Sequence, residues 1–354
     1  MESNKDVLVQ LKGVKTFFPV RAGFFNKVVD HVQAVNDVDL TIYRGETLGL
    51  VGESGCGKTT LGKTIIQLVK ATDGEINYDF GGEIGVHNLR HVSGEIEDLA
   101  RKRIQIVFQD PYSSLNPAFT IYQSLRDPLA KFGIKDKKAQ RELIGKLLEA
   151  VNMRREYMDR YPHEFSGGQR QRIGIARALC VNPEMIVCDE AVSALDVSIQ
   201  AQVLNLLKEL KSRLKLTYIF ITHNLSVVEY ISDRIAVMYL GRIVELANTS
   251  QIFDQTLHPY TEALLSAIPV VDPDKKTSRI VLEGDVPNPI NPPTGCHFHP
   301  RCKKCMEICK TERPPLVKYQ IKGEEHYAAC HLYATAEDGS AQTSEAARKA
   351  FPAN

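Results

Sequence analysis

Short apolar runs and longer segments of helical periodicity alternate along this 354-residue chain. Four of the runs have the length of buried strands, and they occupy residues 47–51, 104–108, 185–188 and 218–222. Apolar positions with helical spacing follow at residues 61–69 and 199–214. Such alternation is typical of parallel strands joined by crossover helices, so the pattern predicts an α/β core.

Two other stretches predict antiparallel structure. Residues 7–11 and 35–42 alternate apolar and polar positions as half-buried strands do, and residues 21–31 between them predict a hairpin or loop. Residues 235–239 and 242–245, joined by a Leu-Gly turn, predict a second hairpin that ends the core.

The remaining segments suggest how the chain is divided. Residues 121–152 are polar and helical, and we expect Pro128 to break the helix there. After Pro269 prolines become frequent and periodicity is weak, so we place a domain boundary between residues 250 and 270. The resulting parts are a main domain, a smaller C-terminal domain and a flexible tail, over residues 1–255, 256–334 and 335–354.

Composition narrows the classes of protein that fit. The 44 Lys and Arg residues nearly balance the 43 Asp and Glu residues, so we expect no nucleic-acid partner. Hydrophobic residues make up 43% of the chain, as in ordinary globular proteins. No apolar run is long enough to span a bilayer, and the first residues lack the apolar core of a signal peptide. We therefore expect a cytosolic protein, or one held at a membrane by other subunits.

A complete phosphate-binding loop, Gly-Glu-Ser-Gly-Cys-Gly-Lys-Thr, occupies residues 52–59 between a predicted strand and a predicted helix. Its glycines allow backbone N–H groups to point at phosphate oxygens, and the helix adds its positive N-terminal end. Lys58 supplies a charge for the β and γ phosphates, and the Thr59 hydroxyl suits Mg²⁺. The predicted ATP-binding residues here are Gly52, Glu53, Ser54, Gly55, Cys56, Gly57, Lys58, Thr59 and Thr60.

Polar side chains follow three of the buried strands at their carboxyl ends. Asp189 and Glu190 come after one strand; we expect Asp189 to hold Mg²⁺ through water and Glu190 to polarise the attacking water. Gln109 follows another strand, from which it would reach both Mg²⁺ and the water. His223 follows a third strand and would contact the γ phosphate. Glu190, His223 and Gln109 are thus the predicted catalytic residues.

A second anion site is predicted at Ser166, Gly167, Gly168 and Gln169, which come just before a helical segment. The first loop already surrounds its nucleotide, so we expect this turn to cover ATP bound to a partner subunit. Residues 193–196, which end in Asp196, would then lie at the joint between the two subunits.

The eight cysteines fall into two groups. Cys56, Cys180 and Cys188 are isolated in the main domain and are interpreted as ordinary small residues. The other five crowd into the C-terminal part, namely Cys296, Cys302, Cys305, Cys309 and Cys330. In a reducing cytosol this clustering favours a metal site over disulfides.

In this order, these elements resemble an ABC-type ATPase, the nucleotide-binding subunit of a transporter. The chain is most similar to the ATP-binding subunits of bacterial oligopeptide and dipeptide importers, up to about Leu332. Three segments carry that resemblance: Phe-Gln-Asp-Pro-Tyr-Ser-Ser-Leu-Asn-Pro at 108–117, His-Pro-Tyr-Thr-Glu-Ala-Leu-Leu at 258–265 and Gly-Cys-His-Phe-His-Pro-Arg-Cys at 295–302. Phe165 departs mildly from the family, where leucine is common.

The resemblance implies a phosphate-loop α/β fold with an antiparallel β subdomain, a helical subdomain at about 110–165 and a small cysteine-rich C-terminal domain. It implies that an aromatic ring stacks on adenine, which we assign to Phe18 with the adjacent Phe17 as the alternative. The groove at Gln109 and the helical subdomain would receive a short helix of a membrane subunit. Implied partners are a second, distinct ATP-binding subunit, two transmembrane permease subunits and, indirectly, an extracytoplasmic substrate-binding protein. The protein would lie on the cytoplasmic face of the membrane.

Relatives carry cysteines at the positions of Cys296, Cys302, Cys309 and Cys330, and some of those relatives bind a 4Fe–4S cluster. The resemblance therefore implies such a cluster, with structural zinc as the alternative because both are held by four thiolates. Cys305 is additional and forms a Cys-x-x-Cys pair with Cys302, so it could replace one ligand.

Three alternatives to a peptide importer subunit remain open at this point. The ATPase does not touch the cargo, so the transporter could carry nickel or glycosides. A soluble ABC ATPase of DNA repair or of the ribosome is disfavoured by the balanced charge and by the segment at 258–265. A metal-binding regulatory module with vestigial ATP motifs would show substitutions at Lys58 or Glu190, and both residues are present.

Overall fold

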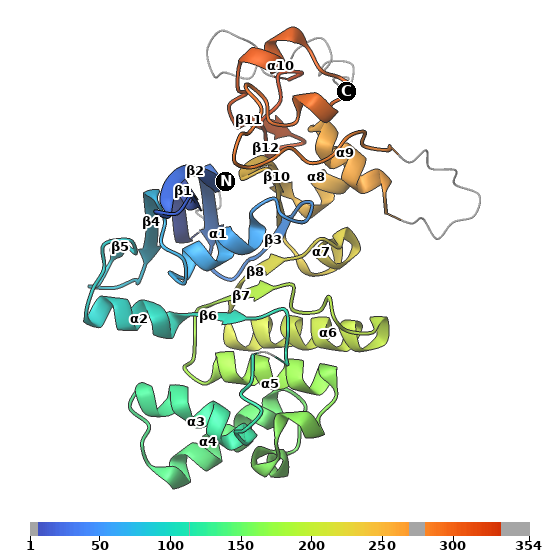
Figure 1. The fold of residues 1–354 in the computed structure, drawn as a ribbon. Helices are drawn as coiled ribbons and strands as arrows, with labels where there is room; N and C mark the ends of the chain where they lie inside the picture. Colours follow the sequence, from blue (N-terminus) through green and yellow to red (C-terminus); the bar gives the residue numbers. More distant parts are fainter. Residues whose placement is uncertain (1–5, 113, 269–279, 334–354) are drawn as a thin grey trace, which may run out of the picture.

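A computed structural model of the protein describes residues 6–112, 114–268 and 280–333. Its larger sheet has eight strands in the order β11-β12-β10-β9-β3-β8-β7-β6 (Figure 1). These strands are β3 (Thr47–Val51), β6 (Ile104–Val107), β7 (Met185–Asp189), β8 (Thr217–Ile221), β9 (Arg234–Tyr239), β10 (Arg242–Asn248), β11 (Val317–Ile321) and β12 (Glu324–Ala328). Strands β3 and β6 to β9 run parallel to their neighbours within this group, which confirms the predicted α/β core.

Helices connect the parallel strands and cover the sheet (Figure 1). They are α1 (Lys58–Ile65), α2 (Glu95–Arg103), α5 (Gly167–Leu179), α6 (Val197–Leu214) and α7 (Leu225–Ile231). Strands β3, β7, β8 and β9 are buried along their whole length, which explains why their sequences are mostly apolar, with polar residues only at their ends. Helix α1 begins at Lys58, earlier than the periodicity at 61–69 predicts. It also ends earlier, because Gln67 adopts a left-handed backbone conformation with φ of +60°.

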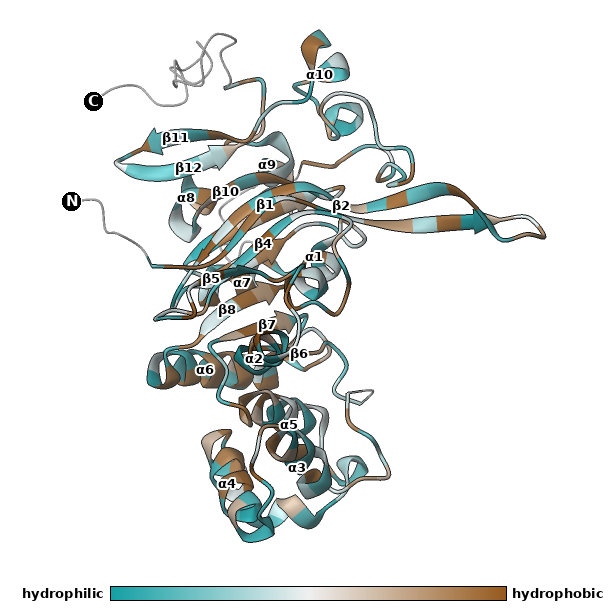
Figure 2. Cartoon of the chain, turned by 90° about the vertical axis from the view of Figure 1, so that its left-hand side faces the viewer, coloured by the Kyte–Doolittle hydropathy of each residue, from teal (hydrophilic) through white to brown (hydrophobic). Residues whose placement is uncertain are grey.

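A separate four-stranded antiparallel sheet has the order β2-β1-β4-β5. Its strands are β1 (Val7–Ala22), β2 (Lys27–Tyr43), β4 (Asp73–Asp79) and β5 (Val86–Asn88). Strands β1 and β2 form a long hairpin that projects from the body (Figure 2), so residues 21–31 are a hairpin as predicted. Phe24 and Phe25 at its turn are 98% and 81% exposed.

A helical layer lies between β6 and β7 in the sequence. It contains α3 (Ile121–Lys131), α4 (Lys137–Ala150) and two short 3-10 helices, η1 (Arg155–Asp159) and η2 (Pro162–Glu164). The predicted break at Pro128 is wrong, because α3 continues to Lys131. A proline within a helix costs about 3 kcal/mol; here the apolar face of α3, with Ile121, Leu125 and Leu129 at most 1% exposed, offsets that cost by burial.

The C-terminal part contains α8 (Thr249–Asp254), α9 (Pro259–Ser266), η3 (His299–Arg301), α10 (Glu307–Thr311) and the β11–β12 hairpin. Strand β12 pairs with β10, so the hairpin of β9 and β10 does not end the sheet as predicted. A buried network fixes this junction: the Glu245 carboxylate bonds to His326 Nε2 at 2.7 Å and accepts the Leu257 N–H at 2.6 Å. The C-terminal hairpin thus extends the sheet of the main domain, and the division at residues 255/256 stays a prediction.

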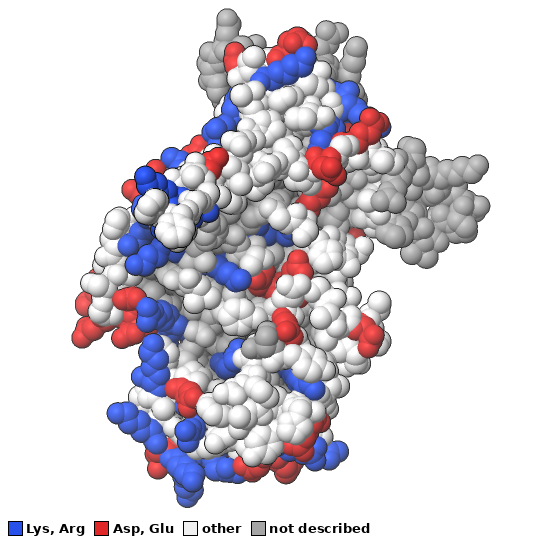
Figure 3. Space-filling view, viewed as in Figure 1, with Lys and Arg blue, Asp and Glu red and all other residues white. Residues whose placement is uncertain are grey.

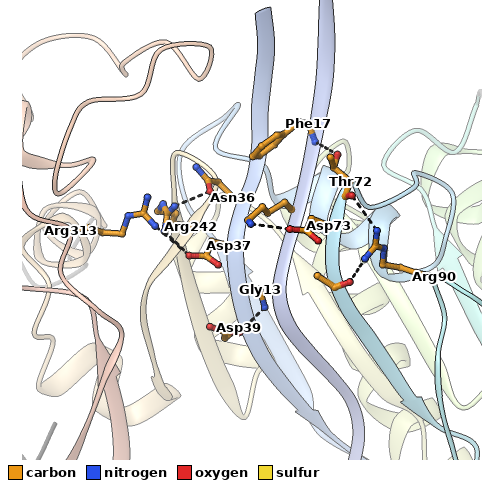
Figure 4. Close-up of polar contacts among 12 residues, drawn as sticks. Gly13, Phe17, Asn36, Asp37, Asp39, Thr72, Asp73, Arg90, Arg242 and Arg313 are labelled. Carbon is orange, nitrogen blue, oxygen red and sulfur yellow. Dashed lines mark hydrogen bonds and ion pairs between the residues drawn. The ribbon is translucent and has the colours of Figure 1, made fainter.

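Ion pairs join the antiparallel sheet to the C-terminal part (Figure 4). Asp37 of β2 lies between Arg313, at 3.3 Å, and Arg242, at 3.7 Å, while Arg242 also donates to the side-chain oxygen of Asn36. On the face drawn in Figure 3, basic and acidic side chains are interspersed. No helix in the described ranges has both the length and the apolar character that a membrane crossing requires.

Candidate functional site

The phosphate-binding loop connects β3 to α1, as the sequence predicts. Gly52 and Gly57 have φ of +150° and +106°, in the region that side chains rarely adopt. A Cβ at Gly52 would lie 2.1 Å from the Met238 carbonyl oxygen, and one at Gly57 would lie 2.0 Å from the Ala34 carbonyl oxygen. The glycines are therefore required because β9 and β2 pack directly against the loop.

Lys58 and Thr59 begin α1 and face the loop and the end of β7. Lys58 is 5% exposed, and its ammonium donates to the carbonyl oxygens of Gly52 at 2.7 Å and Glu53 at 2.9 Å. The Thr59 hydroxyl donates to Asp189 at 2.8 Å. Burial raises the pKa of Asp189 above its usual range, and the Thr59 hydrogen bond opposes that shift. Two oxygen side chains suited to Mg²⁺ thus meet beside the loop.

Glu190 lies at the centre of a second group of side chains. Gln109 Nε2 donates to Glu190 Oε2 at 2.7 Å, and His223 Nδ1 lies 3.3 Å from Glu190 Oε1. Because the carboxyl ends of parallel strands meet at one edge of a sheet, residues far apart in sequence converge here. Glu190 itself has φ of +47°, a conformation that is unfavourable for residues other than glycine and is often found at functional sites.

A cavity of about 300 Å³ joins these groups. It is lined by loop residues together with Lys58, Thr59, Gln109 and Glu190. The sequence did not identify Val32, Gln33, Ala34, Leu240, Gly241 and Pro289, which also line it. A backbone hydrogen bond holds one of these residues against the loop, since the Gly241 N–H donates to the Cys56 carbonyl oxygen at 2.9 Å.

Phe18 lies opposite Val32 in the β1–β2 ladder, so the two side chains share a face of the hairpin next to this cavity. Phe18 is 40% exposed, whereas Phe17 is partly buried and its N–H donates to Thr72 at 2.9 Å (Figure 4). An exposed ring is free to stack on a base, which favours Phe18 over Phe17 as the adenine contact. That assignment stays a prediction.

Ser166 is the N-cap of α5 and closes a capping box with Gln169. Its hydroxyl oxygen accepts the Gln169 N–H at 3.4 Å, which leaves the hydroxyl proton for another acceptor. Gly167 is partly exposed, and Gly168 is buried against Ile199 of α6. None of the described residues that line the cavity beside the phosphate loop comes from 166–169, so this helix start is not part of that cavity.

Asp196 is the N-cap residue of α6, and the segment leading to it is largely at the surface. Ser193, Ala194 and Asp196 are exposed, and Val197 is 81% exposed. Ser193 donates its hydroxyl to the Glu190 carbonyl oxygen at 2.9 Å. A hydrogen bond therefore joins the exposed segment 193–197 directly to Glu190.

Cys296, Cys302, Cys309 and Cys330 line one small cavity, whereas Cys305 does not. All are free thiols. Burial raises the pKa of Cys296 to about 11 and that of Cys330 to about 12, so their thiols are neutral unless a cation is nearby. In the parts of the chain that the structure describes, no three His, Cys, Asp or Glu side chains form a group that could hold a metal ion. A cysteine-rich metal domain is thus not confirmed.

Two residues from the segments that carry the family resemblance also contact the phosphate loop. Tyr260 and Arg301 both contact Glu53. Their segments, at 258–265 and 295–302, gave no local sign of this contact, since neither is near the loop in sequence.

The chain also matches known families and proteins. Residues 35–193 match the family "ABC transporter", and residues 244–309 match "Oligopeptide/dipeptide transporter, C-terminal region". The oligopeptide transport ATP-binding protein AppF of Bacillus subtilis is 48% identical over 94% of this chain and 99% of its own length. The dipeptide transport ATP-binding protein DppF of Haemophilus influenzae is 48% identical over 88% of this chain and 93% of its own.

A solved structure is similar as well. The ATP-binding cassette MJ0796, a dimer in a post-hydrolysis state with ADP and Pi, aligns with a TM-score of 0.59 and 27% identity, covering 68% of this chain and 99% of its own. The fold and the strand-end site thus define an ABC-type ATPase. More closely, the chain belongs to the family of oligopeptide and dipeptide transport ATP-binding proteins.

Proposed function

We propose that this protein hydrolyses ATP to power the import of oligopeptides or dipeptides through a membrane transporter. The observation that carries the cargo assignment is the match of residues 244–309 to the C-terminal region of peptide transporters. The names of AppF and DppF agree with it. Within residues 6–112, 114–268 and 280–333, no feature favours nickel or a glycoside instead.

The residues around the loop suit the binding of Mg-ATP. Backbone N–H groups of the loop bind the phosphates, and Lys58 moves its ammonium from the Gly52 and Glu53 carbonyl oxygens to the β and γ phosphates. Thr59 and Asp189, already in contact, fit Mg²⁺ as hard oxygen ligands. When bound, Mg²⁺ neutralises phosphate charge. Phe18 stacks on the adenine.

Hydrolysis requires a water held in line with the γ phosphate. Glu190 accepts a proton from that water, and Gln109 and His223, in contact with its two oxygens, fix the carboxylate. His223 also reaches the γ phosphate. Positioning and charge neutralisation are the main requirements of phosphoryl transfer, and this group of side chains meets both.

Completion of the site requires a second ATP-binding subunit. The Ser166 hydroxyl proton and the N–H groups at the start of α5 suit a phosphate, yet this helix start is not part of the cavity beside its own loop. We therefore place them against ATP held by the partner. Asp196 and its exposed neighbours lie at the joint, and the dimeric cassette MJ0796 agrees with such an assembly.

The transporter would contain two permease subunits, with a substrate-binding protein outside the cell, and this subunit would lie on the cytoplasmic face of the membrane. The helical subdomain at about 110–165 would receive a permease helix near Gln109. We keep 1–255 as the nucleotide-binding domain and 256–334 as the C-terminal domain, with the tail at 335–354 outside the described residues.

Within the C-terminal domain, four cysteines from separate segments line one small cavity, although the described residues do not form a metal-binding group as they stand. We propose a 4Fe–4S cluster, with zinc as the alternative and Cys305 as a spare ligand. When bound, either would cross-link a proline-rich segment that has little core of its own. Visible absorbance and iron that disappear in Cys302→Ser would support the cluster. A colourless protein that contains one zinc ion per chain would instead show that the site holds zinc and not an iron–sulfur cluster.

The cargo is tested with the native permeases and binding protein reconstituted in liposomes. Labelled peptide should accumulate only with internal ATP, and a Glu190→Gln subunit should abolish both uptake and hydrolysis. Lys208→Gln, a surface change on α6, is a control that should transport normally. Uptake of nickel or a glycoside in place of peptide would refute the cargo assignment and leave the ATPase intact.

A further inference from the structure

Every polar group of Glu53 in the phosphate loop has a partner. Its N–H donates to the Tyr260 hydroxyl at 2.8 Å, and its carbonyl oxygen accepts from Lys58 Nζ at 2.9 Å. Its carboxylate takes two hydrogen bonds from Arg301, at 2.7 and 3.1 Å. Tyr260 and Arg301 stand 207 and 248 residues downstream, so the C-terminal part holds this loop residue by both main chain and side chain.

Both partners are themselves rigidly placed. Tyr260 is 0% exposed and packs against Tyr239 and Phe298, with ring centroids 4.7 and 5.4 Å apart. The Arg301 side chain is 7% exposed, and the Arg301 backbone N–H donates to the Phe298 carbonyl oxygen at 3.0 Å. Two-point contact between a guanidinium and a carboxylate restricts orientation as well as distance. Glu53 is therefore held by two residues that are themselves fixed by contacts with a packed cluster of aromatic side chains.

We infer that Arg301 and Tyr260 are positioning residues for the phosphate loop, through which the C-terminal part sets the affinity for ATP. The loop must present its N–H groups to phosphate oxygens in a fixed arrangement, and ordering a loose loop on binding would weaken affinity. Contacts that fix Glu53 remove the free-energy cost of ordering the loop. They also fix the Glu53 carbonyl oxygen, to which Lys58 is bonded before it moves to the phosphates. This inference depends on the ATP site and is independent of the transported cargo.

The test is a double-mutant cycle in the full-length protein. Glu53→Gln and Arg301→Gln should each raise the Kd for Mg-ATP about tenfold, measured by calorimetry. The double variant should be no weaker than the poorer single variant, because both changes remove one interaction. Tyr260→Phe keeps the ring packing and removes only the hydroxyl, so it should also raise Kd.

Kinetics and stability separate positioning from a general structural role. In the assembled transporter the KM for ATP should rise with Kd while kcat stays within about twofold, as expected when only ground-state binding is lost. Lys304→Gln removes a surface pair with Glu262 in the same region and should change neither constant. Arg301→Lys, which keeps the charge, should recover part of the affinity.

Three results would overturn the inference. The first is an unchanged Kd in Glu53→Gln, whose side chain is 27% exposed and whose loss the fold should tolerate. The second is strictly additive losses in the cycle. The third is a lower melting temperature in Arg301→Gln and Tyr260→Phe without any change in Kd, which would make the contacts purely structural. Cargo uptake is not measured in any of these, so failure here leaves the transport proposal standing.

Discussion

Gly168 in the Ser-Gly-Gly-Gln turn is predicted to be irreplaceable because α6 approaches it too closely. A Cβ there would lie 2.3 Å from Ile199 Cγ2. Normal contact between carbons is about 3.5 Å, so in Gly168→Ala the start of α5 and the Ile199 side chain must separate by about 1.2 Å. Overpacking of this kind costs about 1–3 kcal/mol, which corresponds to roughly 1–4 °C in the melting temperature of a chain this long.

Gly167→Ala provides the matched control. A Cβ at Gly167 would lie 3.6 Å from Leu195 Cδ2, an ordinary contact. Both variants gain the same helix propensity, about 0.5–1 kcal/mol, so the difference between their melting temperatures isolates the clash with Ile199. Differential scanning calorimetry of the two full-length variants measures that difference directly.

The displacement should also slow ATP hydrolysis. A shift of about 1 Å at a positioning group can cost about a hundredfold in rate, so Gly168→Ala should hydrolyse ATP roughly a hundredfold more slowly in the assembled transporter. If Gly168→Ala melted at the same temperature as Gly167→Ala and kept native activity, the packing argument for this helix start would be wrong.

Three further predictions concern single side chains. Glu190→Gln should slow ATP hydrolysis by about 10²–10⁴-fold while ATP-bound dimers accumulate, measured by phosphate release and gel filtration; unchanged turnover would exclude Glu190 as the base. Phe18→Ala should weaken ATP binding severalfold more than Phe17→Ala in calorimetry, and the reverse order would move the adenine contact to Phe17. Burial is the largest influence on Glu245 and raises its pKa, but the interactions with His326, the Leu257 N–H and Thr261 together outweigh it, so the net pKa is lowered. Glu245 therefore stabilises the fold above its unfolded pKa of about 4.3, and that stability is lost as the pH falls through the folded value. Urea unfolding between pH 7 and 3 should show this loss in the native protein and not in Glu245→Gln, which should be less stable at pH 7 by about 3 kcal/mol.

Local patterns were sufficient to predict much of the fold and which side chains gather at the ends of the parallel strands. The phosphate loop, the strand ends at Gln109, Asp189 and His223, and the capping turn at Ser166 were all predicted from sequence. Each depends on neighbouring residues: apolar runs define strands, and polar residues at the carboxyl ends of parallel strands converge on one edge. The break expected at Pro128 failed because burial of α3 against the core outweighs the local cost of proline.

Only the tertiary structure decided which distant segments meet. The sequence alone was sufficient to predict an ABC-type ATPase, because its motifs are short and follow one another in a recognisable order along the chain. It could not show that β12 extends the main sheet or that Tyr260 and Arg301 hold Glu53. These contacts join residues tens to hundreds of positions apart, and they form only when whole surfaces pack, a property that no local period or motif encodes.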